Sequence, residues 1–447
     1  MKRKIIENMK AWLNSSDRKP LILRGARQVG KTWIVRELAK EESYKLIEIN
    51  FERNPEYASW FESNSPKKNI ELIELNMNID IESNKTILFL DEIQAASEIL
   101  PKLRWFYEEL PELAVVCAGS LLEFTLEEHD FSMPVGRINY MYMGPMSFIE
   151  YLWAIGENKL SEYICEARNS LDMAESVHKK CLEIFREYTL IGGMPACVSS
   201  WVENHNITSV YDIQSDLLQT YRDDFNKYKK KISPEVMRMT LASVARQLGG
   251  KFVYSAVDTS NSSVIVKESV NCLALARLVY KAFNTSANGL PLGAEVNQKF
   301  FKCIFIDSGL ALNMLGMRFY TEKEFEETLW INKGAIAEQL VGQLLLTREL
   351  PHEPLVYYWQ KTGSGSGNAE IDYLIAKEGA ILPIEVKAGA SGSMKSLHMF
   401  MESKKLSKAV RFDMNMPSIM GVDVITPQGK PVKYELESLP IYMAEII

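Results

Sequence analysis

Short apolar runs alternate with helical patterns along the first third of the chain. Residues 21–24 and 86–90 are almost entirely apolar, which is typical of buried strands, and residues 113–118 form a third such run. Between the first two runs, residues 33–40 carry apolar side chains at helical spacing. This alternation predicts an α/β domain over residues 1–150.

Helical spacing dominates the middle of the chain. It continues to residue 232, interrupted by the turn Gly192-Gly193-Met-Pro195, and predicts a helical region over 151–232. Ser233-Pro234 marks a new helix start, because a capping residue precedes a proline at the first helical position. Further helices and strand-like runs at 278–283 and 299–306 predict a winged-helix-like domain over 233–325.

Composition and charge narrow the class of protein. The 447 residues correspond to about three domains, and 47% hydrophobic with 24% charged residues is typical of a soluble globular protein. The sequence lacks an apolar run of about 18 residues and an apolar leader, so we expect a cytoplasmic protein without a membrane span. Since the net charge is −7, any DNA contact requires a local basic patch.

Cysteine and histidine usage gives no support for zinc or thiol chemistry. The closest of the six cysteines are 16 residues apart, which leaves no CxxC pair, and the five histidines form no HExxH motif. We therefore interpret the cysteines as reduced structural thiols.

A phosphate-binding loop follows the first strand. The segment Gly25-Ala26-Arg27-Gln28-Val29-Gly30-Lys31-Thr32 fits GxxxxGK[ST] and lies between a predicted strand and a predicted helix that opens with Trp33. The glycines let backbone N–H groups surround phosphate oxygens, at a helix N-terminus that favours anions. Lys31 is expected to reach the β- and γ-phosphates, and Thr32 to hold Mg²⁺. Residues 25–33 are the predicted nucleotide-binding set.

Two acidic residues end the second apolar strand. In Thr86-Ile-Leu-Phe-Leu-Asp91-Glu92, successive side chains point to opposite faces, so the two acids need not have the same role. We expect Asp91 to hold Mg²⁺ and Glu92 to polarise the attacking water as general base.

Two further residues are candidates for contacts with the γ-phosphate. Ser120, after the third strand, is at the position of a phosphate sensor and could equally cap the helix that follows. Arg137, in Pro134-Val-Gly-Arg137, is the candidate for a charge-stabilising arginine, with a surface or structural arginine as the alternative. An arginine acting across a subunit boundary would require an oligomer.

These motifs together resemble the AAA+-related ATPases of bacteria and archaea. The resemblance is carried by the loop at 25–32, Phe-Leu-Asp-Glu-Ile-Gln, Cys-Ala-Gly-Ser and Gly-Pro-Met-Ser-Phe-Ile-Glu-Tyr-Leu, and extends to the segments 188–195 and 301–310. It implies ATP as the nucleotide, and an ASCE-type parallel sheet between helices in which the strand of the catalytic acid lies beside the P-loop strand. A winged-helix domain is also usual in this family. The predicted third helix of that domain carries only Lys267 as a basic residue in this sequence, so a packing role is as well supported as DNA binding.

A second acidic pattern lies near the C-terminus. If Glu378-Gly379 is a hairpin turn, the residue numbers of paired residues sum to 757, which places Asp372 opposite Glu385 and Glu370 opposite Lys387. Carboxylates at paired positions lie close enough to chelate one Mg²⁺ or Mn²⁺. The alternative is a surface hairpin in which Glu370 and Lys387 form an ordinary ion pair.

The D…ExK spacing resembles the PD-(D/E)xK, restriction-endonuclease-like fold, which we assign to residues 326–447. The resemblance implies Asp372 and Glu385 as metal ligands, Lys387 as a catalytic residue, and Glu338 as the acidic residue of the first helix. A nuclease-like fold does not by itself establish cleavage.

Two hypotheses follow. In the first, the protein is an ATP-hydrolysing, nucleic-acid-directed ATPase whose C-terminal domain cuts or grips DNA. In the second, it is an ATP-dependent switch that binds a partner protein through a catalytically silent C-terminal domain. DNA affinity and its salt dependence distinguish them.

Overall fold

The computed structural model describes residues 1–128, 133–228, 232–258, 262–319, 322–361, 369–388 and 394–447, with side chains described from residue 334 onward in the long helix that begins at 322. The chain forms two compact units. The first comprises Met1–Gly144 with Leu275–Arg277 and Leu350–Glu353, and the second comprises the remaining residues.

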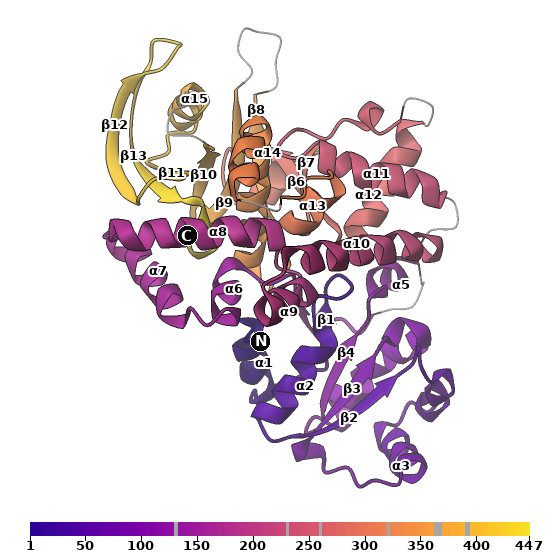
Figure 1. Ribbon diagram of the computed structural model, residues 1–447. Helices are drawn as coiled ribbons and strands as arrows, with labels where there is room; N and C mark the ends of the chain where they lie inside the picture. The colour runs from indigo at the N-terminus through magenta and orange to yellow at the C-terminus, as the bar shows by residue number, and fades with distance from the viewer. Residues whose placement is uncertain (129–132, 229–231, 259–261, 320–321, 362–368, 389–393) are drawn as a thin grey trace. The chain divides into compact units, whose positions relative to one another are not determined.

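The first unit is built on a parallel sheet (Figure 1). Its five strands have the order β2-β3-β4-β1-β5 within the described residues, and every neighbouring pair is parallel. The elements along the chain are α1 (Ile5–Leu13), β1 (Leu21–Arg24), α2 (Lys31–Glu41), β2 (Lys45–Asn50), η1 (Pro55–Phe61), α3 (Pro66–Met77), η2 (Ser83–Lys85), β3 (Thr86–Asp91), η3 (Ile93–Lys102), α4 (Leu103–Glu109), β4 (Ala114–Ala118), α5 (Leu122–Glu128) and β5 (Asn139–Tyr142).

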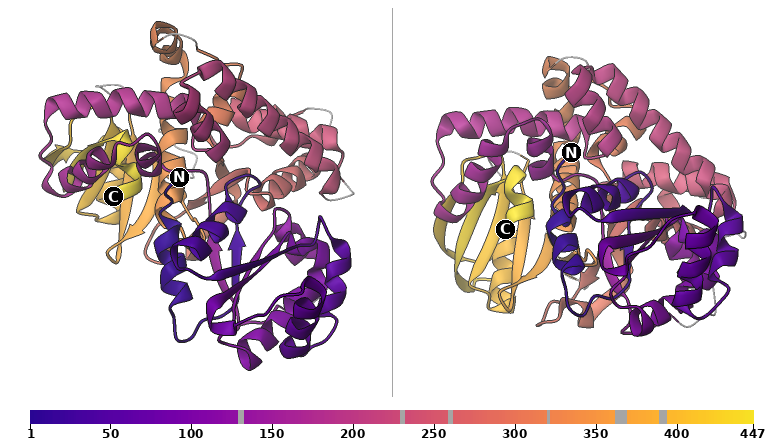
Figure 2. Two further views of the ribbon diagram at one scale, coloured as in Figure 1. Left: turned by 60° about the horizontal axis from the view of Figure 1, so that its bottom comes forward. Right: turned by 90° about the horizontal axis from the view of Figure 1, so that it is seen from below.

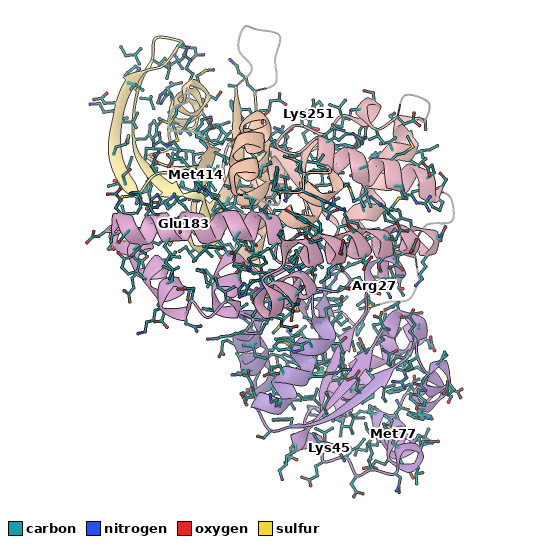
Figure 3. The ribbon with its side chains drawn as sticks, viewed as in Figure 1. Arg27, Lys45, Met77, Glu183, Lys251 and Met414 are labelled. Carbon is teal, nitrogen blue, oxygen red and sulfur yellow. The ribbon has the colours of Figure 1, made fainter. Side chains whose placement is uncertain are left out.

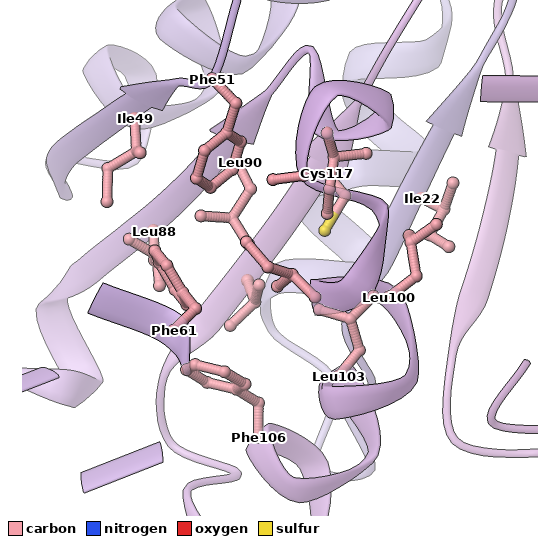
Figure 4. Packing of buried hydrophobic residues seen from close by; sticks show 14 of the residues in the cluster. Ile22, Ile49, Phe51, Phe61, Leu88, Leu90, Leu100, Leu103, Phe106 and Cys117 are labelled. Atoms are coloured by element: carbon pink, nitrogen blue, oxygen red, sulfur yellow. The ribbon is translucent and has the colours of Figure 1, made fainter. Parts of the chain in front are cut away.

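Helices cover both faces of this sheet (Figure 2), which explains why its central strands β1, β3 and β4 are largely apolar. On one face, Leu88 and Leu90 of β3 pack with Phe51, Phe61 and Phe106, all buried (Figure 4). The other face is covered by α2, whose buried residues include Val35 and Leu38. The three predicted strands and the helix after the loop are confirmed within one or two residues.

The order of the strands differs from one expectation. The strand of the predicted catalytic acid, β3, is not beside the P-loop strand β1, because β4 lies between them and pairs with both. The acids of β3 and the end of β4 nevertheless reach the same edge as the P-loop, since parallel strands share the edge at which their carboxyl ends meet.

The second unit opens with helices. They are α6 (Phe148–Ala154), α7 (Asn158–Ser170), α8 (Glu175–Ile191), α9 (Pro195–Asn204), α10 (Ile207–Asp224), η4 (Phe225–Lys227), α11 (Pro234–Arg246), η5 (Tyr254–Ala256) and α12 (Ser263–Leu275). The predicted helix start at Ser233-Pro234 is confirmed, because the Ser233 hydroxyl accepts a hydrogen bond from the backbone N–H of Val236. The predicted break at Gly192–Pro195 separates α8 from α9.

A mixed sheet forms the rest of this unit. Its order is β12-β13-β11-β10-β9-β8-β6-β7, eight strands within the described residues, with β12 and β13 at one edge (Figure 1). The elements are β6 (Val279–Thr285), η6 (Leu292–Glu295), β7 (Val296–Phe305), α13 (Ser308–Met314), α14 (Glu322–Glu349), β8 (Tyr357–Gln360), β9 (Glu370–Lys377), β10 (Ala380–Val386), α15 (Lys395–Lys404), β11 (Lys408–Asp413), β12 (Ser418–Ile425), β13 (Pro431–Pro440) and η7 (Ile441–Ile446).

This sheet joins segments that the sequence pattern assigned to different domains. The β6–β7 hairpin, predicted as the wing of a winged helix, extends the C-terminal sheet because β6 pairs with β8. The predicted boundary between residues 325 and 326 therefore lies within one compact unit, and α14 runs across it.

Candidate functional site: a phosphate-binding loop and a lysine-filled acidic cluster

The loop after β1 has the backbone geometry that phosphate binding needs. Gly25 has φ 151°, and a Cβ there would lie 2.1 Å from the carbonyl oxygen of Met143. Gln28 and Gly30 are left-handed at φ 66° and 98°, and Gly30 leads directly into α2. The sharp turns direct the loop to the N-terminus of a helix, a site that favours anions.

Lys31 is buried and donates hydrogen bonds to its own loop. Its ammonium group contacts the carbonyl oxygens of Gly25, at 2.8 Å, and Ala26, at 2.7 Å. Burial lowers the pKa of Lys31 to about 8, an effect that Glu92 and Asp91 oppose. Both hydrogen-bond partners are uncharged, so the lysine is positioned to exchange them for anionic oxygens.

Thr32 and Asp91 lie close together, and both offer oxygen atoms as metal ligands. The Thr32 hydroxyl lies 3.3 Å from Oδ2 of Asp91, and the amide of Asn50 donates to the same oxygen at 3.1 Å. Burial, and then the neighbouring Glu92, raises the pKa of Asp91. Hydroxyl and carboxylate oxygens are the donors that Mg²⁺ prefers, so these residues fit the ion expected with a nucleotide. Sequence reasoning missed Asn50, although its position at the end of β2 matches that of Asp91 on β3.

Glu92 directly follows β3 and is held in part by Ser120, which lies after the neighbouring strand β4. Its Oε2 accepts hydrogen bonds from the backbone N–H and the hydroxyl of Ser120, both at 3.1 Å, and from the amide of Gln94, at 2.5 Å. Glu92 itself has φ 51°, so its side chain leaves the strand in a different direction from that of Asp91. The structure thus brings together the predicted base and the predicted sensor.

The remaining loop residues differ in exposure. Ala26 and Val29 are buried, whereas Arg27, labelled in Figure 3, and Gln28 are more accessible. Trp33 is 39% exposed and lines a pocket of about 290 Å³ with residues of the N-terminal segment and of its own helix, namely Met1, Lys2, Arg3, Ile6, Ile34, Glu37 and Glu41.

Arg137 lies on the surface of the first unit. Its Nε lies 3.2 Å from a carboxylate oxygen of Glu108 on α4, and its side chain is 44% exposed. Within the described ranges, no contact joins it to the P-loop residues.

Another arginine directly precedes the P-loop. Arg24 forms an ion pair with Glu123 and donates to the hydroxyl of Tyr142 at 2.8 Å. Arg277 lies 3.7 Å from the same Glu123 carboxylate and 5.0 Å from the Tyr142 ring centroid. This buried network, which spacing alone could not predict, anchors the last residue of β1.

The C-terminal hairpin has the predicted register. Ala380 pairs with Lys377 and Ile384 with Tyr373, so the paired residue numbers sum to 757, and Glu378 and Gly379 both have positive φ, as the tight turn requires. Asp372 and Glu385 therefore lie at opposite positions, directly after the pair formed by Tyr373 and Ile384, as expected.

A lysine from another strand occupies the centre of these carboxylates. Nζ of Lys302, on β7, lies 3.0 Å from Glu338, 2.5 Å from Glu370 and 3.6 Å from Asp372. Lys302 is 1% exposed. Burial alone would lower its pKa, but the three carboxylates raise the pKa of Lys302 well above its usual value.

The other members of the cluster are also paired. Lys387 forms an ion pair with Glu385, two residues before it, and Oδ2 of Asp372 accepts the backbone N–H of Val386 at 2.8 Å. The alternative pairing of Glu370 with Lys387 is wrong, because Glu370 contacts Lys302 instead. Burial, and next the Asp372 carboxylate, raises the pKa of both Glu338 and Glu385.

This arrangement does not fit a divalent metal. An ammonium group already occupies the position at which the carboxylate oxygens converge. Among the residues with a described placement, no three His, Cys, Asp or Glu side chains are arranged to hold a metal ion. The C-terminal residues predicted as ligands are thus brought together, but around a lysine.

Three segments of the AAA+ resemblance meet inside the second unit. The backbone N–H of Gly193 donates to Asp307 at 2.6 Å, and its carbonyl oxygen accepts from the N–H of Met146, also at 2.6 Å. A Cβ at Gly193 would lie 2.0 Å from the Met146 carbonyl oxygen. These segments therefore have a packing role in this fold.

A basic pocket lies between α10 and α11. Its volume is about 550 Å³, and it is lined by Gln219, Arg222, Arg238, Met239, Ala242, Arg246 and Val257. Arg238 lies 3.2 Å from Glu235. No ion pair or side-chain hydrogen bond is found for Arg222 or Arg246 in the part of the chain that the structure describes.

Family models match three segments of the chain. A family model described as an AAA domain matches residues 17–152, and models of two domains of unknown function, DUF8612 and DUF4143, match residues 182–320 and 333–425. The comparison with curated proteins returned no match.

Similar solved structures share low sequence identity with the chain. A Walker-type ATPase of Pyrococcus abyssi is 15% identical, with a TM-score of 0.44 over 70% of this chain and 95% of that one. The ORC2 protein of Aeropyrum pernix is 10% identical, at 0.35 over 74% and 95%, and the ORC1 protein of that organism in complex with DNA is 13% identical, at 0.28 over 74% and 92%. Similarity at this level does not extend a function from those proteins to this chain.

The family match and the strand order give the first unit an AAA-type P-loop ATPase fold. Among the helices with a described placement, none is long and apolar enough to cross a membrane.

Proposed function

We propose that the protein binds ATP with Mg²⁺ at the loop between β1 and α2 and hydrolyses it. One observation carries this proposal: Lys31, Thr32, Asp91 and Glu92 lie at one edge of a parallel sheet, with Thr32 and Asp91 only 3.3 Å apart. Phosphoryl transfer depends mainly on positioning and on charge stabilisation, and these residues supply both.

Each residue has a role that follows from its contacts. Lys31 would exchange two carbonyl oxygens for β- and γ-phosphate oxygens. Thr32 and Asp91 would hold Mg²⁺, whose charge would offset that of the phosphates. Glu92 orients the attacking water and accepts its proton. Ser120 and Gln94 hold the Glu92 carboxylate through Oε2, so the other oxygen, Oε1, is the one that would contact the water.

The base would bind beside Trp33. Its exposed indole lines the pocket of about 290 Å³, close to the lower end of the usual range for small-molecule sites. Aromatic stacking on this indole suits a purine ring.

Two substitutions test the ATPase proposal. Lys31→Ala should abolish ATP binding, while Glu92→Gln should retain binding and lose turnover by at least about 100-fold, the usual contribution of a general base. Lys40→Ala is the matched control, since Lys40 is on the same helix but is exposed and lies near Glu37. Unchanged turnover in Glu92→Gln would refute the role assigned to Glu92.

We also propose that the ATPase is directed to nucleic acid through the basic pocket of the second unit. Arg238 and Arg246 are two helical turns apart on α11, with the small Ala242 between them, and Arg222 faces the same pocket from α10. This concentration of guanidinium groups is the local patch that a chain of net charge −7 needs to bind a phosphate backbone.

DNA binding at graded salt concentrations tests this part. The plot of log K against log salt has a negative slope, whose magnitude decreases by about 0.9 for each phosphate group that the protein no longer neutralises. The double substitution Arg222→Gln with Arg246→Gln should therefore decrease that magnitude by about 2. The matched control is Lys179→Gln with Lys433→Gln, which removes two exposed charges from the same unit.

The alternative is an ATP-dependent switch that binds a partner protein. If the wild-type protein does not bind DNA at physiological salt, this alternative replaces nucleic-acid direction, and the ATPase proposal is unaffected. Cleavage of DNA is not part of the proposal, because of the lysine in the C-terminal cluster.

A further inference from the structure

We infer that Lys302 takes the place of a divalent cation in the C-terminal carboxylate cluster, so that this domain does not cut nucleic acid by metal-dependent hydrolysis. The inference rests on the geometry of the second unit and is independent of ATP hydrolysis. Glu338 comes from α14 and Glu370 and Asp372 from β9, and their carboxylates converge on one ammonium group supplied by β7.

Each carboxylate of the cluster already has an ammonium or N–H partner. A divalent ion in such a site requires six or more oxygen ligands. Glu338 and Glu370 face the Lys302 ammonium, Asp372 is shared between that ammonium and the N–H of Val386, and one oxygen of Glu385 contacts Lys387. Within the described part of the chain, the second Glu385 oxygen is buried without a partner. A cation placed where the carboxylates converge would have to displace the Lys302 ammonium.

Lys302 is not free to move aside. Its backbone is paired on one side with Ala282 of β6 and on the other with Lys251, which is labelled in Figure 3. Its ammonium group lies 5.6 Å from the ring centroid of Tyr358 and 6.0 Å from that of Tyr373. Lys302 is 1% exposed, so its side chain is enclosed by the fold. If it withdrew, the carboxylates would lose their shared cation, which is strongly unfavourable for buried charges.

The same geometry predicts what removal of this lysine would do. Lys302→Met keeps a long apolar side chain but leaves the carboxylates of Glu338, Glu370 and Asp372 without their shared cation. A divalent ion could then restore the charge balance. The variant should therefore be less stable than the wild type without metal and should gain a divalent-cation site that the wild type lacks.

The test uses the full chain without nucleotide and follows thermal unfolding with and without Mn²⁺, together with Mn²⁺ binding by electron paramagnetic resonance. The wild type should bind no Mn²⁺ at the cluster and show no shift in Tm. Lys302→Met should show a lower Tm that rises by several degrees with Mn²⁺, and Asp372→Asn added to it should remove that rise. Lys281→Met on the adjoining strand is the matched control, because Lys281 contacts Asn271 rather than a carboxylate.

Several outcomes would overturn the inference. Mn²⁺ binding by the wild type that is lost in Asp372→Asn would show that the cluster accepts a metal beside Lys302. Metal-dependent DNA cleavage by the wild type that is abolished by Asp372→Ala with Lys387→Ala would do the same. A soluble Lys302→Met variant that neither binds Mn²⁺ nor gains Tm from it would refute the argument that Lys302 takes the place of a cation. If that variant does not fold, the comparison of wild type with Asp372→Asn decides the question alone.

Discussion

The state of Lys31 predicts that ATP binding takes up protons at alkaline pH. In the unliganded protein, burial lowers the pKa of Lys31 to about 8, and its two hydrogen-bond partners are neutral carbonyl oxygens. Phosphate oxygens next to the same ammonium favour its charged form and raise its pKa on binding. Molecules that have lost this proton must therefore recover it when ATP binds.

The magnitude follows from the titration of a single group. With a pKa of about 8, roughly half of the Lys31 side chains are neutral at pH 8 and about one tenth at pH 7. ATP binding should take up about 0.5 proton per site at pH 8 and about 0.1 at pH 7, and Kd should rise about tenfold between pH 7 and pH 9.

Isothermal titration calorimetry in two buffers with different ionisation enthalpies measures this uptake. The difference in apparent binding enthalpy between the buffers should be large at about pH 8 and small at about pH 7, so the protein serves as its own control. A Kd that does not change across this range, with equal enthalpies in both buffers, would show that Lys31 is fully charged before ATP binds.

Three further predictions concern stability and turnover. The pKa of Asp307 is raised to about 6 by burial, so the folded protein holds this proton more tightly than the unfolded chain, and the stability contributed by Asp307 is lost as pH rises from about 4 to 6. In urea unfolding, the free-energy difference between wild type and Asp307→Asn should fall by up to about 3 kcal/mol over that range, and a constant difference would contradict this reasoning. Gly193→Ala should destabilise the protein by more than about 3 kcal/mol in thermal unfolding because its Cβ meets the Met146 backbone, whereas Gly421→Ala, with open space around it, should not. Arg137→Ala should change ATP turnover by less than about twofold, since this exposed side chain is paired with Glu108, and a tenfold loss would assign it to the reaction.

Local patterns predicted local structure well. The P-loop, the strand ending in Asp91-Glu92 and the hairpin register at 370–387 each depend on residues close in sequence, and the structure contains all three. The turn at Glu378-Gly379 fixes which residues are paired, so the opposite positions of Asp372 and Glu385 followed from counting alone.

Relations between distant segments were not predictable in this way. Nothing in the spacing of β1 and β3 states that β4 lies between them. Likewise, the partners of Lys302 are 36 to 70 residues away, on elements whose adjacency only the folded sheet defines. One local indication was available: Lys302 is the single charged residue within the apolar run 300–306, so it has to find carboxylates if that strand is buried.

The two buried lysines explain why chemistry is expected at one acidic edge and not at the other. Lys31 donates to neutral carbonyl oxygens, and burial lowers its pKa, so exchanging those partners for phosphate oxygens stabilises its charge. Lys302 already faces three carboxylates that raise its pKa, so no incoming ligand offers it a better environment. Both sites combine a lysine with acidic residues, but only at the P-loop are the lysine's hydrogen-bond partners uncharged. Binding energy from a nucleotide is therefore available at the P-loop, whereas Lys302 already has its anionic partners within the fold.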